Sequence, residues 1–558
     1  MKTTRFLVAI TLATAMSIFA ADKPEEKLKP GLDVITPDGM LAHIKVLSSD
    51  EFEGRAPGTK GEELSVNYIT DQFKKIGLKP GNPDGTYLQE VPLAGIKSEP
   101  KMSFATGTTT ELKYPDDYVA TSARLQDKIK VDNSDVVFVG YGIVAPEYGW
   151  DDYKGVDVKG KTILMLINDP PIPDPKDPSK LDDKMFKGRA MTYYGRWTYK
   201  YEIAAEKGAA AAIIIHETEP AAYPYSVVKT SWAKENYEID APDKNKDAVQ
   251  VRSWITRDVA TKLFDDCGHD FDATKKFAAT KEFHPLLLNA RANIEIKQQV
   301  RSLKSRNVIG KLEGSDAKLK DEYVLFTAHW DHLGKHPELQ GDQIFNGAVD
   351  NASGDAAVLQ LAAAFSKLNP APKRSVLFMC TTAEEAGLLG AKFYAQHPLY
   401  PLEKTLADIN IDSMNVWGKA RDVEDTSFGF STLDDLLATA AKRQGRTAIA
   451  NSRPEKGSIY RADNFEFSKV GLPSLYIGKG EHLISRAPEA PLRSDEFDLK
   501  DYHQATDQVN ADWDLSGAVQ DVDLLFEVGS QVANGDKFPE WKSGNEFKAK
   551  RDAMMKKQ

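Results

Sequence analysis

The sequence predicts an α/β protein built on a doubly wound, mostly parallel sheet with helices on both faces. Between residues 296 and 535, apolar runs of about five residues alternate with helical patterns, which is typical of such a sheet. The runs are apolar throughout, as expected of strands buried on both faces. A strand-rich block over residues 115–295 interrupts the alternation and predicts a smaller, β-rich inserted domain.

The N-terminal part of the larger domain, residues 21–114, begins with two helical patterns around a loop that contains Arg55. The second helix is predicted to end at Gly77, because glycine favours the left-handed conformation that terminates helices. Its apolar positions recur at helical spacing, at Leu64, Tyr68, Ile69 and Phe73.

Strands and helices then alternate along the larger domain. The successive segments are "YVLFTAHWD", "NASGDAAVLQLAAAFSKL", "RSVLFMCTTAEE", "LADINIDSMN", "LDDLLATAAKRQG" and "GLPSLYIG". The last segment of the chain, residues 536–558, is rich in charge, and we expect it to form a solvated helix end.

The N-terminus has the layout of a cleaved secretory signal over residues 1–20. Lys2 and Arg5 precede an apolar run that is followed by small residues and then by charge. This pattern predicts export to the periplasm or the exterior. We see no later run that is apolar enough to span a membrane, so we expect no stable span after cleavage.

Composition argues against nucleic acid as a partner. The chain has 72 basic and 83 acidic residues, a net charge of -11, and no long basic run. It has two cysteines, Cys267 and Cys380. An oxidising compartment would permit a bridge between them, but Cys380 lies in an apolar strand and is better explained as a small buried hydrophobe.

Side chains that carry chemistry follow the predicted strands at their carboxyl ends. In doubly wound sheets these ends meet at one edge. Singly, a histidine here could be a satisfied core residue and an aspartate a helix cap or a turn residue. Together they predict a metal site, because acids gathered at one edge are costly unless cations neutralise them. The group comprises His329, Asp331, Asp350, Glu384, Glu385, Asp412 and His503.

Glu384 and Glu385 are adjacent carboxylates at the end of an apolar strand. Without a cation, repulsion and poor solvation would favour protonation of at least one of them. Acidic residues are also common in the first turn of a helix, so the pair alone is ambiguous.

Imidazoles and carboxylates without thiolates suit zinc, with manganese or cobalt as alternatives. The carboxylates outnumber the needs of one tetrahedral ion, which indicates two ions about 3.5–4 Å apart that share a bridging ligand. Asp331 lies two residues after His329, so both side chains leave the same face of an extended strand. We expect the Asp331 carboxylate to accept the free ring N–H of His329.

Five motifs resemble, in order, those of the co-catalytic zinc aminopeptidases: "AHWDHLG", "FNGAVDNASG", "TTAEEAGLLG", "NIDSMN" and "YHQATDQ". This family includes secreted bacterial leucyl-type enzymes and is related to glutamate carboxypeptidase and the transferrin receptor. The resemblance covers residues 36–100 and 300–530 and implies the zinc exopeptidase fold. Residues 115–295, with "VFVGYGI" and "KGAAAAIII", resemble a protease-associated domain, which by its position would limit substrate size at the rim of the site.

The resemblance also implies a role for each site residue. Asp350 would bridge two Zn²⁺ ions, and a cis peptide bond would follow it at Asp350–Asn351. Glu384 would be the general base, with Asp331 as a further catalytic residue. The remaining ligands would be His329 and Asp412 for one ion, and Glu385 and His503 for the other.

The implied activity is release of N-terminal amino acids from peptides with a free N-terminus, by a bridging metal-bound water whose proton Glu384 accepts. A glutaminyl-cyclase-like reaction, which typically uses one zinc, is an alternative on the same fold. Carboxypeptidase action on acidic C-termini is another. A non-catalytic, receptor-like ectodomain is disfavoured, because such proteins lose ligands and every ligand position is filled here.

One loop departs from the family pattern. Where many relatives read Ser-Asp-His, this chain reads Ala462, Asp463 and Asn464, so the resemblance does not fix substrate preference. Asp463 and Tyr460 are candidate substrate contacts. Tyr460 could hydrogen-bond the tetrahedral intermediate, and a packed loop tyrosine is the equally favoured alternative.

Overall fold

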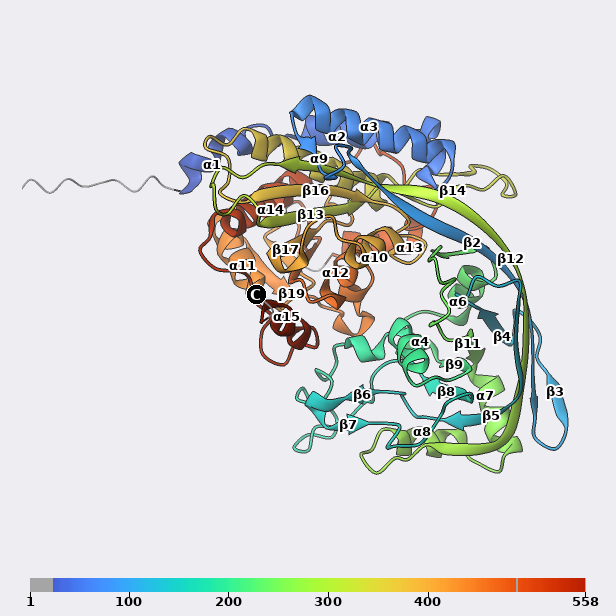
Figure 1. The fold of residues 1–558 in the computed structure, drawn as a ribbon. Coiled ribbons are helices and arrows are strands. Elements are labelled where there is room, and N and C mark those ends of the chain that lie inside the picture. The colour runs from blue at the N-terminus through green and yellow to red at the C-terminus, as the bar shows by residue number, and fades with distance from the viewer. Residues whose placement is uncertain (1–23, 488–489, 557–558) are drawn as a thin grey trace, which may run out of the picture.

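The computed structural model describes residues 24–487 and 490–556 (Figure 1). The predicted signal over residues 1–20 lies outside the described residues. Within them, no helix has the length and apolar character needed to cross a bilayer.

The main sheet confirms the predicted α/β class. Strand β13 (Tyr323–His329) is parallel to β16 (Ser375–Thr381) on one side and to β17 (Thr405–Asn410) on the other. β17 is in turn parallel to β20 (Ser474–Gly478). Antiparallel pairs occur towards the edges, between β20 and β18 (Asp422–Asp425) and between β16 and β12 (Leu286–Leu312), while β19 (Thr447–Ala450) pairs with β18 in parallel.

Helices cover both faces of this sheet, because alternate residues of its strands point to opposite sides. Phe326 of β13 belongs to a large apolar cluster, while its neighbour Leu325 belongs to a smaller cluster on the other side. The smaller cluster includes residues of α10 (Leu389–Gln396) and α12 (Asn464–Lys469). The large cluster includes residues of α2 (Pro37–Leu47), α3 (Lys60–Ile76), α9 (Ser353–Ser366), α11 (Leu433–Arg443) and α14 (Ser516–Asn534).

The two N-terminal helices form where the sequence predicts them. The Thr59 side chain accepts a hydrogen bond from the Gly61 amide and so caps the first turn of α3. The helix ends at Gly77, whose φ of 91° lies in the left-handed region. Helix α2 begins in the same way, with Thr36 as its cap.

A long antiparallel ribbon joins the main sheet to a second region. It consists of β2 (Leu88–Ala105) and β12, which pair from Leu88 with Val308 to Ala105 with Arg291. The ribbon runs down the right side of Figure 1 and connects the upper and lower halves of the molecule.

The second region, residues 115–295, contributes most of a separate apolar cluster. Its parallel strands are β5 (Lys128–Phe138), β8 (Thr162–Leu166), β9 (Ala211–His216) and β11 (Val251–Thr256), and β4 (Tyr118–Thr121) is antiparallel to β11. Helices α4 (Trp197–Glu206), α7 (Arg257–Asp266) and α8 (Phe271–Ala278) accompany them. Its assignment as a protease-associated domain stays a prediction.

The last segment departs from expectation, because residues 536–556 are anchored to the molecule. Trp541 and Phe547 are buried in an apolar cluster, and α15 (Lys548–Met555) follows them. Arg551 is also buried and donates hydrogen bonds to the carbonyls of Leu402 and Thr405. The charge-rich composition of this segment gave no indication that these few side chains would be buried.

Both cysteines are free. Cys380 is buried in β16, which confirms its interpretation as a small core residue, whereas Cys267 is partly exposed after α7.

Candidate metal centre

The predicted site residues meet where parallel strands of the main sheet end. His329 is the last residue of β13, and Glu384 follows the end of β16. Asp412 comes two residues after β17. Asp350 lies in the short turn Ala348–Ala352, which leads into α9. Four separate segments therefore place their side chains at one edge of the sheet, as the strand pattern predicts.

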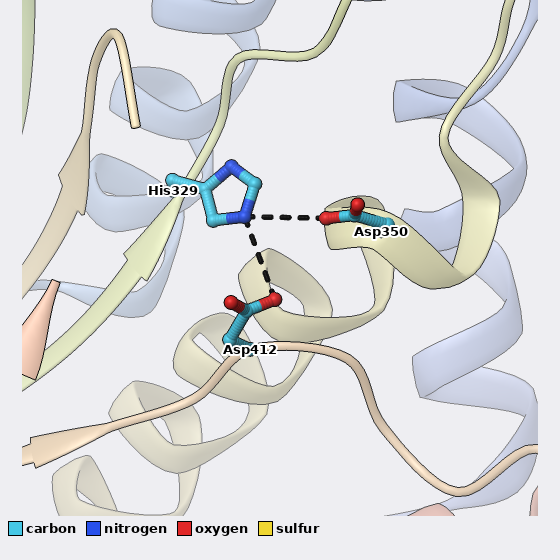
Figure 2. Close-up of side chains that lie close together, drawn as sticks. All are labelled: His329, Asp350 and Asp412. Atoms are coloured by element: carbon cyan, nitrogen blue, oxygen red, sulfur yellow. Dashed lines mark ion pairs between the residues drawn. The ribbon is translucent and has the colours of Figure 1, made fainter. Parts of the chain in front are cut away.

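One group of three side chains surrounds the ring nitrogen Nε2 of His329 (Figure 2). This atom lies 3.3 Å from Oδ1 of Asp350 and 3.5 Å from Oδ1 of Asp412. His329 and Asp350 are buried, while Asp412 is partly exposed. Atoms this close, contributed by an imidazole and two carboxylates, form a group that could hold a metal ion.

A second group lies on the other side of Asp350. Oδ2 of Asp350 is 3.2 Å from Nε2 of His503, and this nitrogen is 3.1 Å from Oε2 of Glu385. Asp350 is thus the shared member of the two groups, with one oxygen directed to each.

Glu384 stands apart from the second group although it precedes Glu385 in the chain. Its Oε2 is 4.0 Å from Nε2 of His329. The amides of Glu384 and Glu385 donate to the two carboxylate oxygens of Asp331, at 3.0 and 3.3 Å. Asp331 therefore fixes the turn that sends two neighbouring glutamates in different directions.

The Asp331 contact differs from the one expected. Nδ1 of His329 lies 3.1 Å from the backbone carbonyl oxygen of Asp331 and 3.8 Å from its carboxylate. The carbonyl thus orients the imidazole, because the carboxylate is occupied by the two glutamate amides. Strand geometry predicted the correct face but not which oxygen of Asp331 makes the contact.

Two supporting residues were not predicted. Nδ1 of His332 is 2.7 Å from Oε1 of Glu385, and His332, Asp350 and Glu385 form a further group that could hold a metal. Asp507 accepts hydrogen bonds from the amides of Val349 and Asp350, at 2.9 and 3.0 Å. Both lie inside the motifs quoted above: His332 directly follows Asp331, and Asp507 comes four residues after His503. Their proximity in sequence to predicted site residues was the signal that could have identified them.

Arg55 ties together the two loops that carry His329 and Asp350. It is completely buried and donates to the carbonyls of Trp330, Asn346 and Gly347, at 2.8, 2.6 and 2.9 Å, and to that of Leu47. An arginine fork suits this task, because its several donors are rigidly arranged.

The peptide bond between Asp350 and Asn351 is cis, which confirms that prediction. The Asn351 side chain connects this turn to the segment around Asp412. Its amide nitrogen donates to the carbonyl of Ile411, and its oxygen accepts from the amide of Ser413.

The chemistry of these atoms fits cations. Within the described part of the chain, the Nε2 atoms of His329, His332 and His503 are buried and make no hydrogen bond of normal geometry, although carboxylate oxygens lie 3.1–3.5 Å from those of His329 and His503. Burial alone would lower the pKa of His329 and of His503, yet the surrounding carboxylates raise both pKa values well above the ordinary one. A cluster of such ring nitrogens and excess carboxylates matches the donor set of zinc.

Two carboxyl groups beside the ligands have raised pKa values. Burial, reinforced by Asp412 and Glu385, raises the pKa of Glu384 well above its ordinary value. Burial also raises the pKa of Asp331 to about 8, against the opposing effect of His329. Glu384 thus lies in an environment that favours its protonated form.

The two candidate substrate contacts, Asp463 and Tyr460, have different hydrogen-bond partners. Asp463 is buried, accepts a hydrogen bond from the Thr381 hydroxyl, and has a pKa raised to about 6 by burial. It is close enough to His329 for their charges to interact. The Tyr460 hydroxyl donates instead to Oε1 of Glu546, at 2.6 Å. Substrate contact by either residue stays a prediction.

The fold and the site together define an α/β protein with a cluster of imidazoles and carboxylates that could hold metal. Residues 307–526 match the sequence profile of Peptidase family M28. The match agrees with the recognition made from the motifs, and it supports the metallopeptidase class for this segment of the chain.

Several curated proteins resemble the chain. The "Probable lipoprotein aminopeptidase LpqL" of Mycobacterium tuberculosis is 24% identical over 502 residues, which cover 85% of this chain and 81% of that protein. A "Probable zinc metalloprotease" of Pyrenophora teres f. teres is 39% identical over 106 residues, 19% of this chain and 22% of that protein. A "Vacuolar membrane protease" of Lodderomyces elongisporus is 29% identical over 36% of this chain. The chain spans 20% of that last protein and 22% of the Pyrenophora protein.

Among solved structures, the aminopeptidase from Aneurinibacillus sp. strain AM-1 matches with a TM-score of 0.49 and 19% identity, over 94% of this chain and 97% of that one. A Peptidase M28 precursor from Shewanella amazonensis matches with a TM-score of 0.42 and 18% identity, over 92% and 98%.

Proposed function

We propose that this chain is an aminopeptidase that works with two zinc ions. The observation that carries the proposal is the position of Asp350, whose two carboxylate oxygens face two different imidazoles at 3.3 and 3.2 Å. A carboxylate placed in this way is suited to bridge a pair of cations.

His329 and Asp412 would complete one ion site, and His503 and Glu385 the other. We assign His503 rather than His332 as the ligand because its Nε2 lies beside both carboxylates of the second group. Nδ1 of His332 is hydrogen-bonded to Glu385, which suits a residue that orients a ligand.

Two zinc ions bound there would polarise the carbonyl of the scissile peptide bond and make the attacking water more acidic. Glu384 would accept the proton of this water and return it to the leaving amine. Asp331 would hold the backbone of the glutamate pair, so that Glu384 faces the reacting groups while Glu385 remains a ligand.

The substrate class is a peptide with a free N-terminus. The five ordered motifs support it, and so does the similarity, over most of both chains, to the mycobacterial protein named "Probable lipoprotein aminopeptidase LpqL". The N-terminal pattern supports export to the periplasm or the exterior.

Glu384→Gln tests the role assignment. We expect turnover of leucyl-p-nitroanilide to fall by about 10²–10⁴-fold, the usual value of a general base, with two zinc ions per chain retained. The matched variant is Glu385→Gln, in which zinc content should fall together with activity. Zinc is measured by mass spectrometry after dialysis.

Near-normal turnover by Glu384→Gln would refute the base assignment. One zinc per chain, with cyclisation of N-terminal glutamine, would favour the cyclase alternative. Preferential cleavage of N-acetylated peptides at their C-terminus would favour the carboxypeptidase alternative.

A further inference from the structure

The second region touches the loop that leads to Asp463. Its segment 187–196 lies against loop 453–463 of the main domain. The amide of Met191 donates to the carbonyl of Pro454 at 3.1 Å, and Arg189 pairs with Glu455 at 2.9 Å. The ring of Tyr193 packs edge-on against Phe465, with centroids 5.1 Å apart. The second region therefore lies next to the metal centre through this loop.

Arg196, at the end of that segment, is a buried charge without a partner. Arg196 is only 8% exposed. Among the residues that the structure describes, no hydrogen bond or ion pair involves its guanidinium, and its Nε is buried and unpartnered. Other buried arginines are satisfied: Arg55 by backbone carbonyls and Arg446 by Asp521 at 2.7 Å.

A second arginine, Arg461, adds charge at the same place. Burial, reinforced by the neighbouring Arg461, lowers the pKa of Arg196 to about 9. Arg196 thus remains protonated at neutral pH. Arg461 stacks on Tyr223 of the second region, 5.8 Å from the ring centroid. Arg461 is exposed and donates from its Nε to the carbonyl of Lys456. The desolvated charge is that of Arg196, which an anion would neutralise.

We propose that Arg196 and Arg461 bind a carboxylate on the leaving-group side of the peptide substrate. The inference rests on the proposed function, because it assumes that a peptide lies across the metal centre. Arg461 is two residues from Asp463, which accepts a hydrogen bond from Thr381 at the end of the strand that leads to Glu384. Guanidinium groups recognise carboxylates through paired, charge-assisted hydrogen bonds. The enzyme would therefore favour short peptides whose C-terminus is free.

The test compares three substrates that share an N-terminal leucine. Leu-Gly-Gly carries the carboxylate, Leu-Gly-Gly-amide lacks it, and leucyl-p-nitroanilide lacks both the carboxylate and the peptide extension. For the unaltered protein we expect kcat/KM to be about 10–100-fold higher for the free acid than for the amide, since a hydrogen bond to a charged group has this value. Comparing kcat/KM for Leu-Gly-Asp-amide and Leu-Gly-Asn-amide separates recognition of an acidic side chain from recognition of the C-terminal carboxylate.

In Arg196→Gln the preference for the free acid should disappear through a higher KM, while hydrolysis of the anilide stays unchanged. Arg196→Lys, which keeps the charge, should retain part of the preference. Arg189→Gln is the matched control, because it alters an exposed arginine that docks the same segment.

Equal kcat/KM values for acid and amide in the unaltered protein, with the anilide cleaved, would overturn the carboxylate site and leave the proposed function intact. Loss of preference in Arg189→Gln as large as in Arg196→Gln would also overturn it, because docking rather than charge would then be responsible. Failure to cleave any of these substrates would overturn the proposed function and the carboxylate site with it.

Discussion

Two buried groups of charged side chains, one in each half of the chain, are stabilised in different ways. At the metal centre, His329 and His503 have buried ring nitrogens that make no hydrogen bond of normal geometry in the described residues. In the second region, Lys200 and Asp152 are buried and Asp169 is partly buried, and none of their side-chain atoms is among the buried, unpartnered ones of the described chain.

The second group is satisfied by the chain itself. Nζ of Lys200 donates to the carbonyls of Tyr141 and Asn168, at 2.6 and 3.1 Å. Asp169 accepts from the Thr192 amide and hydroxyl, and Asp152 accepts from the Ile143 amide and the Trp150 ring. Buried charge alone therefore does not indicate a binding site, because the chain can satisfy it with its own hydrogen bonds.

Asp350→Asn should produce the largest effect. Loss of the shared carboxylate should remove both zinc ions and reduce leucyl-p-nitroanilide hydrolysis by at least about 100-fold, since loss of mere supporting contacts around a metal reduces binding or activity by 10–100-fold. Zinc per chain and kcat are the measurements. Asp169→Asn, the same substitution in the other group, should keep two ions; two ions in Asp350→Asn would contradict the bridging role.

Lys200→Met should lower the free energy of unfolding by about 1–3 kcal/mol, because it leaves the carbonyls of Tyr141 and Asn168 without their donor and removes the positive charge that acts on the two aspartates. Zinc content should not change. Urea unfolding followed by circular dichroism measures the loss. Adding Asp152→Asn and Asp169→Asn to Lys200→Met should recover part of the stability; a loss below about 1 kcal/mol in the single variant would show that this group is not held by its internal cation.

His332→Asn should weaken the affinity for one zinc ion by about 10–100-fold, the usual effect of removing a residue that orients a ligand. Zinc titration against a chelator measures it. His336→Asn is the control, because His336 lies in the same loop but pairs with the exposed Glu338. Loss of the ion equal to that in His503→Asn would make His332 a ligand instead.

The sequence predicted those parts of the molecule that depend on local pattern. Apolar runs located β13, β16 and β17, and the residues after them identified the metal-centre group, because parallel strands bring their ends to one edge. Gly77 marked the end of α3 for an equally local reason.

Contacts set by tertiary packing were not predictable. Whether His329 meets the carbonyl or the carboxylate of Asp331 depends on where the amide of Glu384 lies, in a segment some 50 residues away. The burial of Arg551 depends on the carbonyls of another loop. The lack of a hydrogen-bond partner for Nε of Arg196 depends on which side chains pack around it, and no local sequence pattern predicts this.

The smallest predicted effect is a pH dependence that arises in the second region. Burial raises the pKa of Asp152 and of Asp169 to about 7, above an unfolded value of about 3.9. Between these values the folded chain binds more protons than the unfolded chain, so this contribution to stability is complete below about pH 4 and is lost as the pH rises through about 7. Each group contributes a slope of up to about 1.4 kcal/mol per pH unit.

Asp169→Asn should therefore reduce the fall in unfolding free energy between pH 5 and 7. Urea unfolding measures it, in an Asp350→Asn background so that zinc binding adds no pH dependence of its own. Identical slopes with and without Asp169 would show that its carboxyl is ionised in the folded chain, and the two buried groups would then differ less than their hydrogen bonds indicate.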